Sequence, residues 1–216
     1  MNTYKVILFD LDGTLSDPKE GITKSVQYAL QRMNIHKVDV DQLEKFIGPP
    51  LQVSFADYYG FNKEKVDIAI GHYRARFKEK GMYENELYPQ IPSLLKTLKE
   101  SDMTLVVATS KPTVYSEQIL KHFKVDDYFD LVVGSNLDGT RTSKEEIIQN
   151  ILNTYYEYQL EDFIMVGDRK HDVIGANQTG IDSLAVTYGY GSLEELREFS
   201  PTYIVNTVDE IKDILT

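Results

Sequence analysis

Short apolar segments that alternate with helical patterns, and one wholly helical stretch after the first of these segments, predict an α/β fold. The apolar segments are continuous rather than alternating and are rich in β-branched residues, as is typical of strands covered on both faces. Strand and helix alternation of this kind builds a doubly wound parallel sheet. The sequence therefore predicts a Rossmann-like core into which an α-helical cap is inserted.

Six apolar segments are the expected strands of this core. They cover residues 6–9, 105–108, 131–133, 163–166, 183–186 and 203–205. A doubly wound parallel sheet binds its ligands beyond the carboxyl ends of the strands. We therefore expect a functional site among the residues that directly follow these segments.

The helical stretch begins with a pattern typical of a helix N-terminus. Asp17 stands as the N-cap, Pro18 as the first-turn proline and Glu20 as the carboxylate at the third helical position. Apolar residues then recur at helical spacing, namely Ile22, Val26, Leu30 and Met33. The pattern predicts an amphipathic helix of about four turns.

A second amphipathic helix is expected from Asn62 to a left-handed C-terminal cap near Gly81. Its apolar face consists of Val66, Ile70, Tyr73 and Phe77. Shorter helical segments are expected around 39–46 and 51–59, separated by Gly-Pro-Pro at 48–50. The inserted cap is therefore expected to be helical throughout.

Charge also distinguishes the helical stretch from the rest of the chain. Residues 16–88 carry 11 basic and 11 acidic side chains, whereas all other residues carry 12 and 23, so the net charge of −11 lies outside this stretch. No linker rich in Gly, Ser or Pro separates the two parts. We predict a Rossmann-like core of residues 1–15 and 89–216 with an inserted α-helical cap of residues 16–88.

The composition of the 216 residues excludes several classes of protein. The net charge of −11 would repel a phosphate backbone, so no nucleic-acid partner is expected. The absence of cysteine excludes thiolate catalysis, thiolate metal sites and disulfides. The N-terminal segment turns acidic after about six apolar-leaning residues, too few for a signal peptide or a membrane span. We expect a cytoplasmic protein without a membrane partner, either a monomer or a homodimer.

Two carboxylates follow the first expected strand, in the segment DLDGT at 10–14. Strand alternation puts Asp10 and Asp12 on the same side, and Gly13 permits a tight turn. Carboxylates this close repel one another unless a cation or a shared proton relieves them. Taken alone, the segment also fits a turn with exposed aspartates.

Hydroxyl and ammonium groups follow the next two expected strands. Thr109 and Ser110 come after the second strand, where they also suit an ordinary helix cap. Ser143 opens a capping-box pattern after the third strand, with Lys144 in the first helical turn. A cation there opposes the helix dipole, which is tolerable on a surface and useful where an anion binds.

Asp168 and Asp172 follow the fourth expected strand, four residues apart. With Asp10 and Asp12 they bring four carboxylates to one edge of the sheet. Carboxylates without a histidine partner favour a hard cation, and Mg²⁺ held by carboxylates and substrate phosphate oxygens fits best. The glycine-rich loop 188–191 after the fifth strand is either a simple turn or a further wall of this site. Such a site has the nucleophile, cation and donors that phosphoryl transfer needs.

These residues resemble the four signature motifs of the haloacid dehalogenase superfamily. The matching segments are DLDGT at 10–14, the strand that ends in Thr109, Lys144, and GDRKHD at 167–172. The helical stretch resembles the small α-helical cap of that superfamily. GPPL at 48–51 is similar to the cap sequence of its phosphoglycolate phosphatase and 5′-nucleotidase-like branch.

The resemblance implies roles for the carboxylates. Asp10 is the expected nucleophile, which forms an aspartyl-phosphate. Asp12 is expected to protonate the leaving oxygen and then to activate the water that hydrolyses the intermediate. Mg²⁺ is expected to be held by Asp10, by the backbone carbonyl of Asp12 and by Asp168, with Asp172 orienting metal-bound water.

The resemblance also implies a phosphate-binding set. Thr109 is expected to donate to a phosphate oxygen, and Lys144 to neutralise charge while holding Asp10 in place. Ser110 completes the expected substrate-binding residues together with Arg141, which lies three residues before Lys144 and is able to share its role.

Differences from sister activities narrow the expected reaction. Dehalogenases of this superfamily lack the second acidic residue of the first motif, which is Asp12 here, and mutases place a histidine where this chain has Ile22. We expect Mg²⁺-dependent hydrolysis of the phosphate monoester of a small metabolite, similar to phosphoglycolate phosphatase. The alternatives are a 5′-nucleotidase acting on nucleoside monophosphates, an inorganic pyrophosphatase, and a non-enzymatic phospho-acceptor module of receiver type.

Overall fold

The computed structural model describes residues 4–36 and 38–216. The chain forms two compact units, one composed of Met1–Asp17 and Leu87–Thr216 and the other of Pro18–Glu86. The second unit begins and ends two residues inside the expected cap of residues 16–88. Within the described residues, no helix has both the length and the apolar composition needed to span a membrane.

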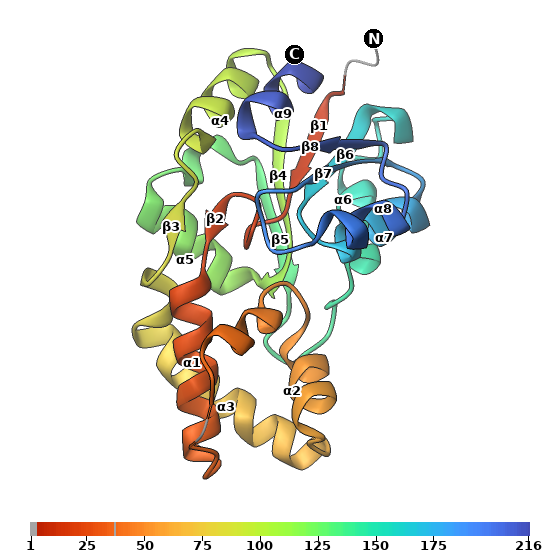
Figure 1. The fold of residues 1–216 in the computed structure, drawn as a ribbon. Coiled ribbons are helices and arrows are strands. Elements are labelled where there is room, and N and C mark those ends of the chain that lie inside the picture. The colour runs from red at the N-terminus through yellow and green to blue at the C-terminus, as the bar shows by residue number, and fades with distance from the viewer. Residues whose placement is uncertain (1–3, 37) are drawn as a thin grey trace. The chain divides into compact units, whose positions relative to one another are not determined.

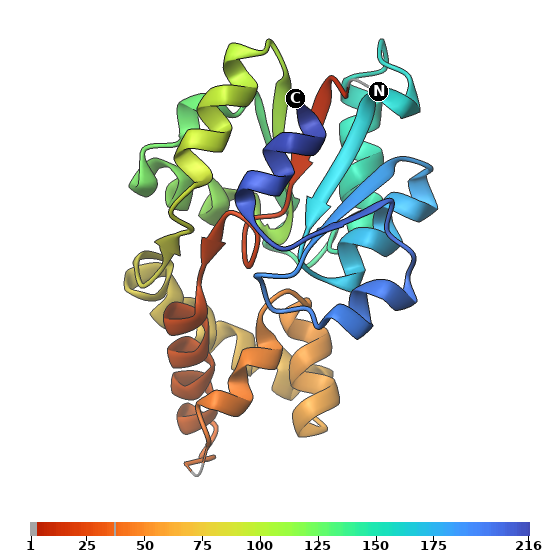
Figure 2. The same cartoon turned by 45° about the horizontal axis from the view of Figure 1, so that its top comes forward.

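The first unit contains a parallel sheet with helices on both faces (Figure 1). Its strands in the described residues are, in sheet order, β5 (Leu131–Ser135), β4 (Thr104–Pro112), β1 (Val6–Phe9), β6 (Phe163–Gly167), β7 (Asp182–Val186) and β8 (Tyr203–Val205). One face carries α4 (Ile91–Glu100), α5 (Thr113–Phe123) and α9 (Val208–Leu215), and the other carries α6 (Lys144–Thr154), α7 (Lys170–Thr179) and α8 (Leu193–Glu198) (Figures 1 and 2). Short 3₁₀ helices, Asp126–Tyr128 and Leu160–Asp162, precede β5 and β6. The predicted doubly wound α/β fold is confirmed.

The core of this unit lies between the sheet and its helices. Alternate residues of the three central strands pack against α6 in one buried cluster, which includes Val6, Leu8, Val106, Ala108, Phe163, Met165, Ile147, Ile148 and Ile151. The intervening residues Ile7 and Phe9 are also fully buried, on the other face. Burial on both faces explains the continuous apolar segments and fixes the positions of the polar residues that follow them.

Strand β4 is longer than the apolar segment predicts. Ala108 pairs with Val133 and Pro112 with Ser135, so β4 advances four residues while β5 advances two. This β-bulge carries the strand through Thr109 and Ser110, which therefore do not form a helix cap.

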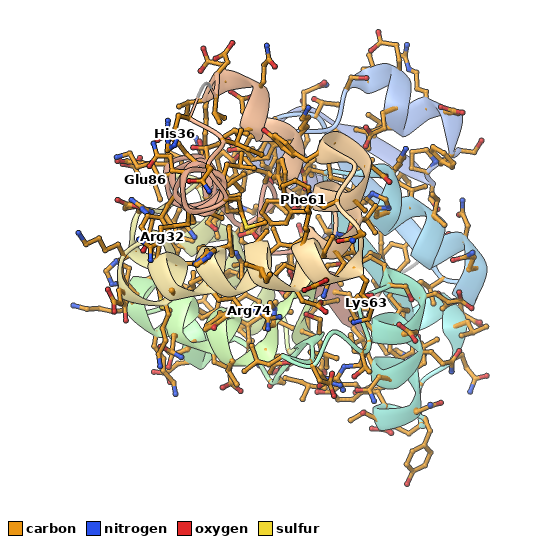
Figure 3. The ribbon with its side chains drawn as sticks, turned by 90° about the horizontal axis from the view of Figure 1, so that it is seen from below. Arg32, His36, Phe61, Lys63, Arg74 and Glu86 are labelled. Carbon is orange, nitrogen blue, oxygen red and sulfur yellow. The ribbon has the colours of Figure 1, made fainter. Side chains whose placement is uncertain are left out.

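The second unit is helical (Figure 1). Its described elements are α1 (Lys19–Arg32), the 3₁₀ helix Asp41–Phe46, α2 (Leu51–Tyr59), α3 (Lys63–Glu79) and the 3₁₀ helix Gly81–Tyr83. The short strands β2 (Ser16–Asp17) and β3 (Glu86–Leu87) lead out of the first unit and back into it. Phe61 lies in the segment between α2 and α3, before Lys63 at the start of α3 (Figure 3), and its ring stacks on that of Phe55 at 6.1 Å between centroids.

The expected N-cap of α1 is wrong. The helix begins at Lys19, with Pro18 before it and no side-chain cap. Asp17 ends strand β2, and its carboxylate accepts a hydrogen bond from the Tyr190 hydroxyl instead. The partner that draws Asp17 away is distant in sequence, so local pattern does not reveal it. By contrast, the expected cap of α3 is confirmed, because Asn62 Oδ1 accepts a hydrogen bond from Lys65 N at 3.0 Å.

The expected left-handed cap at Gly81 is also wrong. Helix α3 ends at Glu79, and Gly81 does not have a positive φ. A Cβ on Gly81 would lie 2.6 Å from Ser25 Oγ and 2.9 Å from the Gly21 carbonyl oxygen. Glycine is therefore required here because helix α1 packs closely against this backbone, not because the helix ends in a left-handed turn.

Candidate active site

Asp10 is the first residue after β1, and a tight turn follows it. Its Oδ1 accepts a hydrogen bond from Leu11 N at 2.7 Å. Gly13 has φ +84° and donates its N–H to the Ser16 carbonyl at 2.8 Å, which confirms the predicted turn. A Cβ on Gly13 would lie 2.2 Å from Asp168 Oδ2. Glycine is therefore required at position 13 for two reasons: it adopts the positive φ of the turn, and it leaves room for the carboxylate of Asp168.

Lys144 lies at the centre of the site. The predicted capping box is present, since Ser143 and Glu146 hydrogen-bond reciprocally and Lys144 is the first residue of α6. Its Nζ is 2.9 Å from Asp10 Oδ1 and 2.6 Å from Asp172 Oδ1. The same group donates to the Ala108 carbonyl at 2.8 Å. One buried ammonium therefore connects the end of β1 and the middle of β4 with the start of α7.

Asp168 completes a cluster of buried carboxylates. It is fully buried, and its Oδ2 accepts a hydrogen bond from Tyr190 N at 2.7 Å. Its Oδ1 accepts a longer one from the Thr14 hydroxyl at 3.3 Å. Asp10, Asp168 and Asp172 each offer an oxygen within 4.8 Å of the others. Three of the four carboxylates predicted from the strand ends thus form one cluster.

The carboxylates of this cluster outnumber the ammonium group that contacts them. Burial raises the pKa of Asp168 well above its usual range, and the neighbouring Asp172 and Asp10 add to the effect. Burial also raises the pKa of Asp172, although Lys144 opposes this. Burial disfavours the charge on Lys144, but the attraction of Asp10 and Asp172 outweighs it and raises the pKa of Lys144. Three carboxylates against one ammonium suit a divalent cation with oxygen ligands.

Asp12 is not one of these three clustered carboxylates, and its side chain contacts a different lysine. Its Oδ2 is 2.7 Å from Lys111 Nζ, and both side chains are almost buried. Its Oδ1 is buried and accepts no hydrogen bond from any residue that the structure describes. Burial raises the pKa of Asp12 against the opposing attraction of Lys111. The carboxyl group expected to move protons is thus separate from the carboxylates expected to bind metal.

Thr109 and Ser110 occupy the bulged end of β4. Thr109 directly follows Ala108, whose carbonyl accepts from Lys144, and Thr109 is 2% exposed. Its Oγ1 accepts a hydrogen bond from Lys111 N at 3.3 Å. Ser110 Oγ instead donates to the Thr142 carbonyl at 3.0 Å. Thr109 therefore follows the carbonyl that binds Lys144, whereas the described hydroxyl contact of Ser110 is with the loop before α6.

Arg141 is not brought together with the carboxylates. Its Nε donates to the Gly134 carbonyl at 2.8 Å, and its Nη2 lies 3.3 Å from Asn136 Oδ1. Its backbone has φ +51°, in the left-handed region. The guanidinium thus stabilises the loop that leads to α6, and its described contacts differ from those of Lys144.

Two site residues were not predicted, namely Lys111 and Tyr190. Lys111 lies within the bulge of β4, where the regular alternation of side chains is interrupted, so local pattern does not reveal where its side chain points. For the second, the sequence is compatible with loop 188–191 as either a simple turn or a wall of the site. The loop does reach the site, since Tyr190 N donates to Asp168 and Tyr188 Oη donates to the Thr14 carbonyl at 2.8 Å.

A doubly wound core whose strand ends gather buried carboxylates around a lysine is the arrangement expected of a hydrolase that transfers phosphoryl groups. The family described as haloacid dehalogenase-like hydrolase matches residues 7–186, and the chain belongs to this family. This membership confirms the resemblance seen in the four motifs.

Named relatives agree with this membership. A 5′-nucleotidase of Pseudomonas aeruginosa is 47% identical over 212 residues, which cover 98% of this chain and 96% of that protein. A phosphoglycolate phosphatase of Colwellia psychrerythraea is 25% identical over an alignment of 219 residues, which covers 96% of this chain and 95% of that protein. The crystal structure of a predicted phosphatase from Clostridium acetobutylicum has a TM-score of 0.94 and 51% identity, over 98% of each chain. The chain is therefore a phosphatase, as expected, and not a receiver-type module.

Proposed function

We propose that this phosphatase is a Mg²⁺-dependent 5′-nucleotidase that hydrolyses nucleoside monophosphates through an aspartyl-phosphate on Asp10. The observation that carries the proposal is the buried cluster of Asp10, Asp168 and Asp172 around Lys144. The choice of substrate rests on 47% identity to a 5′-nucleotidase, against 25% to a phosphoglycolate phosphatase. Phosphoglycolate, the substrate expected first from sequence, becomes the second candidate. The sequence motifs indicate phosphoryl transfer, but none of their residues is expected to contact the leaving group, so they do not distinguish the two substrates.

The donor set fits Mg²⁺. The side chains of Asp10 and Asp168 and the backbone carbonyl of Asp12 would hold the ion, since Mg²⁺ prefers oxygen ligands. Both oxygens of Asp172 are engaged, one by Lys144 and the other by Arg169 N at 3.0 Å, so Asp172 would orient metal-bound water. When bound, the cation supplies positive charge to the carboxylates and to the transferring phosphoryl group.

The chain's own residues account for two half-reactions. In the first, a carboxylate oxygen of Asp10 attacks phosphorus, the bond from phosphorus to the nucleoside oxygen breaks, and Asp12 gives that oxygen a proton. In the second, Asp12 takes a proton from water, the water oxygen attacks phosphorus, and the bond from phosphorus to Asp10 breaks. Inorganic phosphate leaves and both carboxyl groups return to their starting states.

Lys144 and Thr109 support these steps. Lys144 holds Oδ1 of Asp10 at 2.9 Å and balances part of its charge, and the Thr109 hydroxyl would donate to a phosphate oxygen. Ser110 and Arg141 complete the proposed phosphate-binding set. Their described partners include the carbonyl oxygens of Thr142 and of Gly134 in β5, so both would have to exchange these hydrogen bonds for phosphate oxygens.

A hydrolysis panel tests the proposed substrate class. We expect kcat/KM with Mg²⁺ to be highest for nucleoside 5′-monophosphates and lower for phosphoglycolate, sugar phosphates and pyrophosphate. Phosphoglycolate at the head of the ranking would restore the second candidate.

Asp10→Asn, which removes the nucleophile but keeps its shape, should abolish turnover of every substrate, and near wild-type rates in this variant would refute the mechanism.

The metal assignment has a test that does not depend on activity. A ligand at 100 times its Kd stabilises a folded protein by about 2.7 kcal/mol. We expect Mg²⁺ to raise the melting temperature of the wild type and to raise that of Asp168→Asn much less. Equal shifts in the two proteins, or no shift in the wild type, would contradict the assignment.

A further inference from the structure

Lys111 contacts the proton-transfer carboxyl group but has no role in the reaction described so far. Its Nζ lies 2.7 Å from Asp12 Oδ2, and the two side chains are 6% and 10% exposed. Burying two charges costs hydration free energy that their mutual attraction often fails to recover. Stability alone is therefore a weak reason for this ion pair, and its position on Asp12 suggests a part in the chemistry.

The backbone of Lys111 is fixed by its surroundings. Lys111 lies inside the bulge of β4, where its N–H donates to Thr109 Oγ1 at 3.3 Å. Its carbonyl passes so close to Gly134 that a Cβ there would lie 2.2 Å from the carbonyl oxygen. Bulges re-aim individual side chains and often occur beside active sites. The strand irregularity thus holds the base of the lysine side chain firmly.

The two oxygens of Asp12 have different surroundings. Lys111 holds Oδ2, whereas Oδ1 is buried and accepts no hydrogen bond within the described part of the chain. Lys144, the other lysine of the site, contacts Asp10 and Asp172. The described ion pairs of the two lysines therefore involve different carboxylates, and the contact with Lys111 distinguishes the two oxygens of Asp12.

We propose that Lys111 is a positioning residue that holds Asp12 Oδ2, so that Oδ1 delivers the proton to the leaving oxygen. The proposal rests on the proposed function, in which Asp12 is the general acid. It predicts an effect that depends on the leaving group. A nucleoside 5′ oxygen departs poorly without a proton, whereas p-nitrophenolate departs without one.

The test compares these two leaving groups in Lys111→Met. The value of kcat/KM reports the steps up to phosphorylation of Asp10, before the intermediate is hydrolysed. We expect it to fall about 100-fold for a nucleoside monophosphate and less than about tenfold for p-nitrophenyl phosphate. Equal losses for the two substrates, or no loss for the nucleotide, would overturn the proposal. Lys96→Met, the same change at an exposed lysine that pairs with Glu100 at 3.8 Å, is the matched control and should leave both values unchanged.

A double variant protects the test against misfolding of Lys111→Met. In Asp12→Asn with Lys111→Met neither partner is charged, so no unpaired charge is buried. If Lys111 acts through Asp12, the double variant should match Asp12→Asn in nucleotide kcat/KM to within about threefold. A further loss of about 100-fold in the double variant would show that Lys111 acts independently of Asp12 and would reject the positioning role.

Failure of this inference is distinguishable from failure of the proposed function. If the wild type hydrolyses neither substrate, or Asp10→Asn remains active, the proposed function fails and the role of Lys111 fails with it. The wild type and Asp10→Asn can instead behave as proposed while Lys111→Met leaves unchanged the ratio of kcat/KM for the nucleotide to kcat/KM for p-nitrophenyl phosphate. In that case only the positioning role is rejected.

Discussion

The two units of the molecule bury different kinds of polar residue. The buried charged residues that the structure describes all lie in the first unit, and they are Asp10, Asp12, Lys144, Asp168 and Asp172. The buried polar residues described in the second unit are neutral, namely Thr23, Ser25, Ser54 and Asn85. Buried charge is costly unless it is paired or used. The comparison indicates that the first unit carries the chemistry and that the interior of the second unit serves packing.

Removing a lysine from each unit should give the largest contrast. Lys144→Met leaves Asp10 and Asp172 buried without their cation, and we expect a loss of about 3–5 kcal/mol in the free energy of unfolding. Activity should fall at least about 100-fold. Lys24→Met removes an exposed ion pair with Glu20 and should change stability by less than about 0.5 kcal/mol. Denaturant unfolding measures the stability of both variants. Similar losses of stability in Lys144→Met and Lys24→Met would contradict the difference between the two units.

Two glycines with similar backbones allow a sharper test. Gly13 has φ +84° and Gly60 has φ +62°, so an alanine at either position costs about 1–2 kcal/mol in strain. At Gly13 the new Cβ would also meet Asp168 Oδ2 at 2.2 Å, whereas at Gly60 nothing lies within 4 Å. We expect Gly13→Ala to add about 1–3 kcal/mol for the clash and to lower activity. Equal changes in melting temperature for the two variants would contradict this.

A smaller effect than these losses in the first unit is expected for the Arg76–Glu84 ion pair of the second unit. Arg76 donates two hydrogen bonds to Glu84, at 2.8 and 2.9 Å, and this contact lowers the pKa of Glu84 from 4.5. A lowered pKa in the folded state stabilises the fold above the ordinary glutamate pKa, and the gain disappears as the pH falls through the lowered value. Glu84→Gln should therefore cost about 1 kcal/mol at neutral pH and progressively less below pH 4.5. A difference from wild type that stays constant down to about pH 3 would exclude the ion pair as its source.

The fold and the carboxylate cluster were predictable from sequence for the same reason. Continuously apolar segments mark the buried strands, and the residues directly after them must lie at the carboxyl ends of the sheet. Asp10 and Asp168 occupy such positions, and Lys144 opens the helix that follows β5, so their proximity follows from topology.

The remaining features depend on contacts that are distant in sequence. Lys111 is carried into the site by a bulge, which changes the register of β4 without a change in local composition. The local sequence around Asp17 predicts a helix cap, but its carboxylate accepts a hydrogen bond from Tyr190, which is distant in sequence. Gly81 looks like a helix end until helix α1 is packed against it. Local propensity is overridden in each case by tertiary contact.

Tyr190 has a consequence for the modular exchange of the helical insertion. Its N–H holds the carboxylate of Asp168, and its hydroxyl holds Asp17, the last residue before the chain enters the second unit. A chimaera that receives a foreign insertion after residue 15 would discard Asp17 and release the phenol. A junction placed after residue 17 would keep this tether. The splice point, as much as the grafted module, therefore decides whether the recipient site retains its shape.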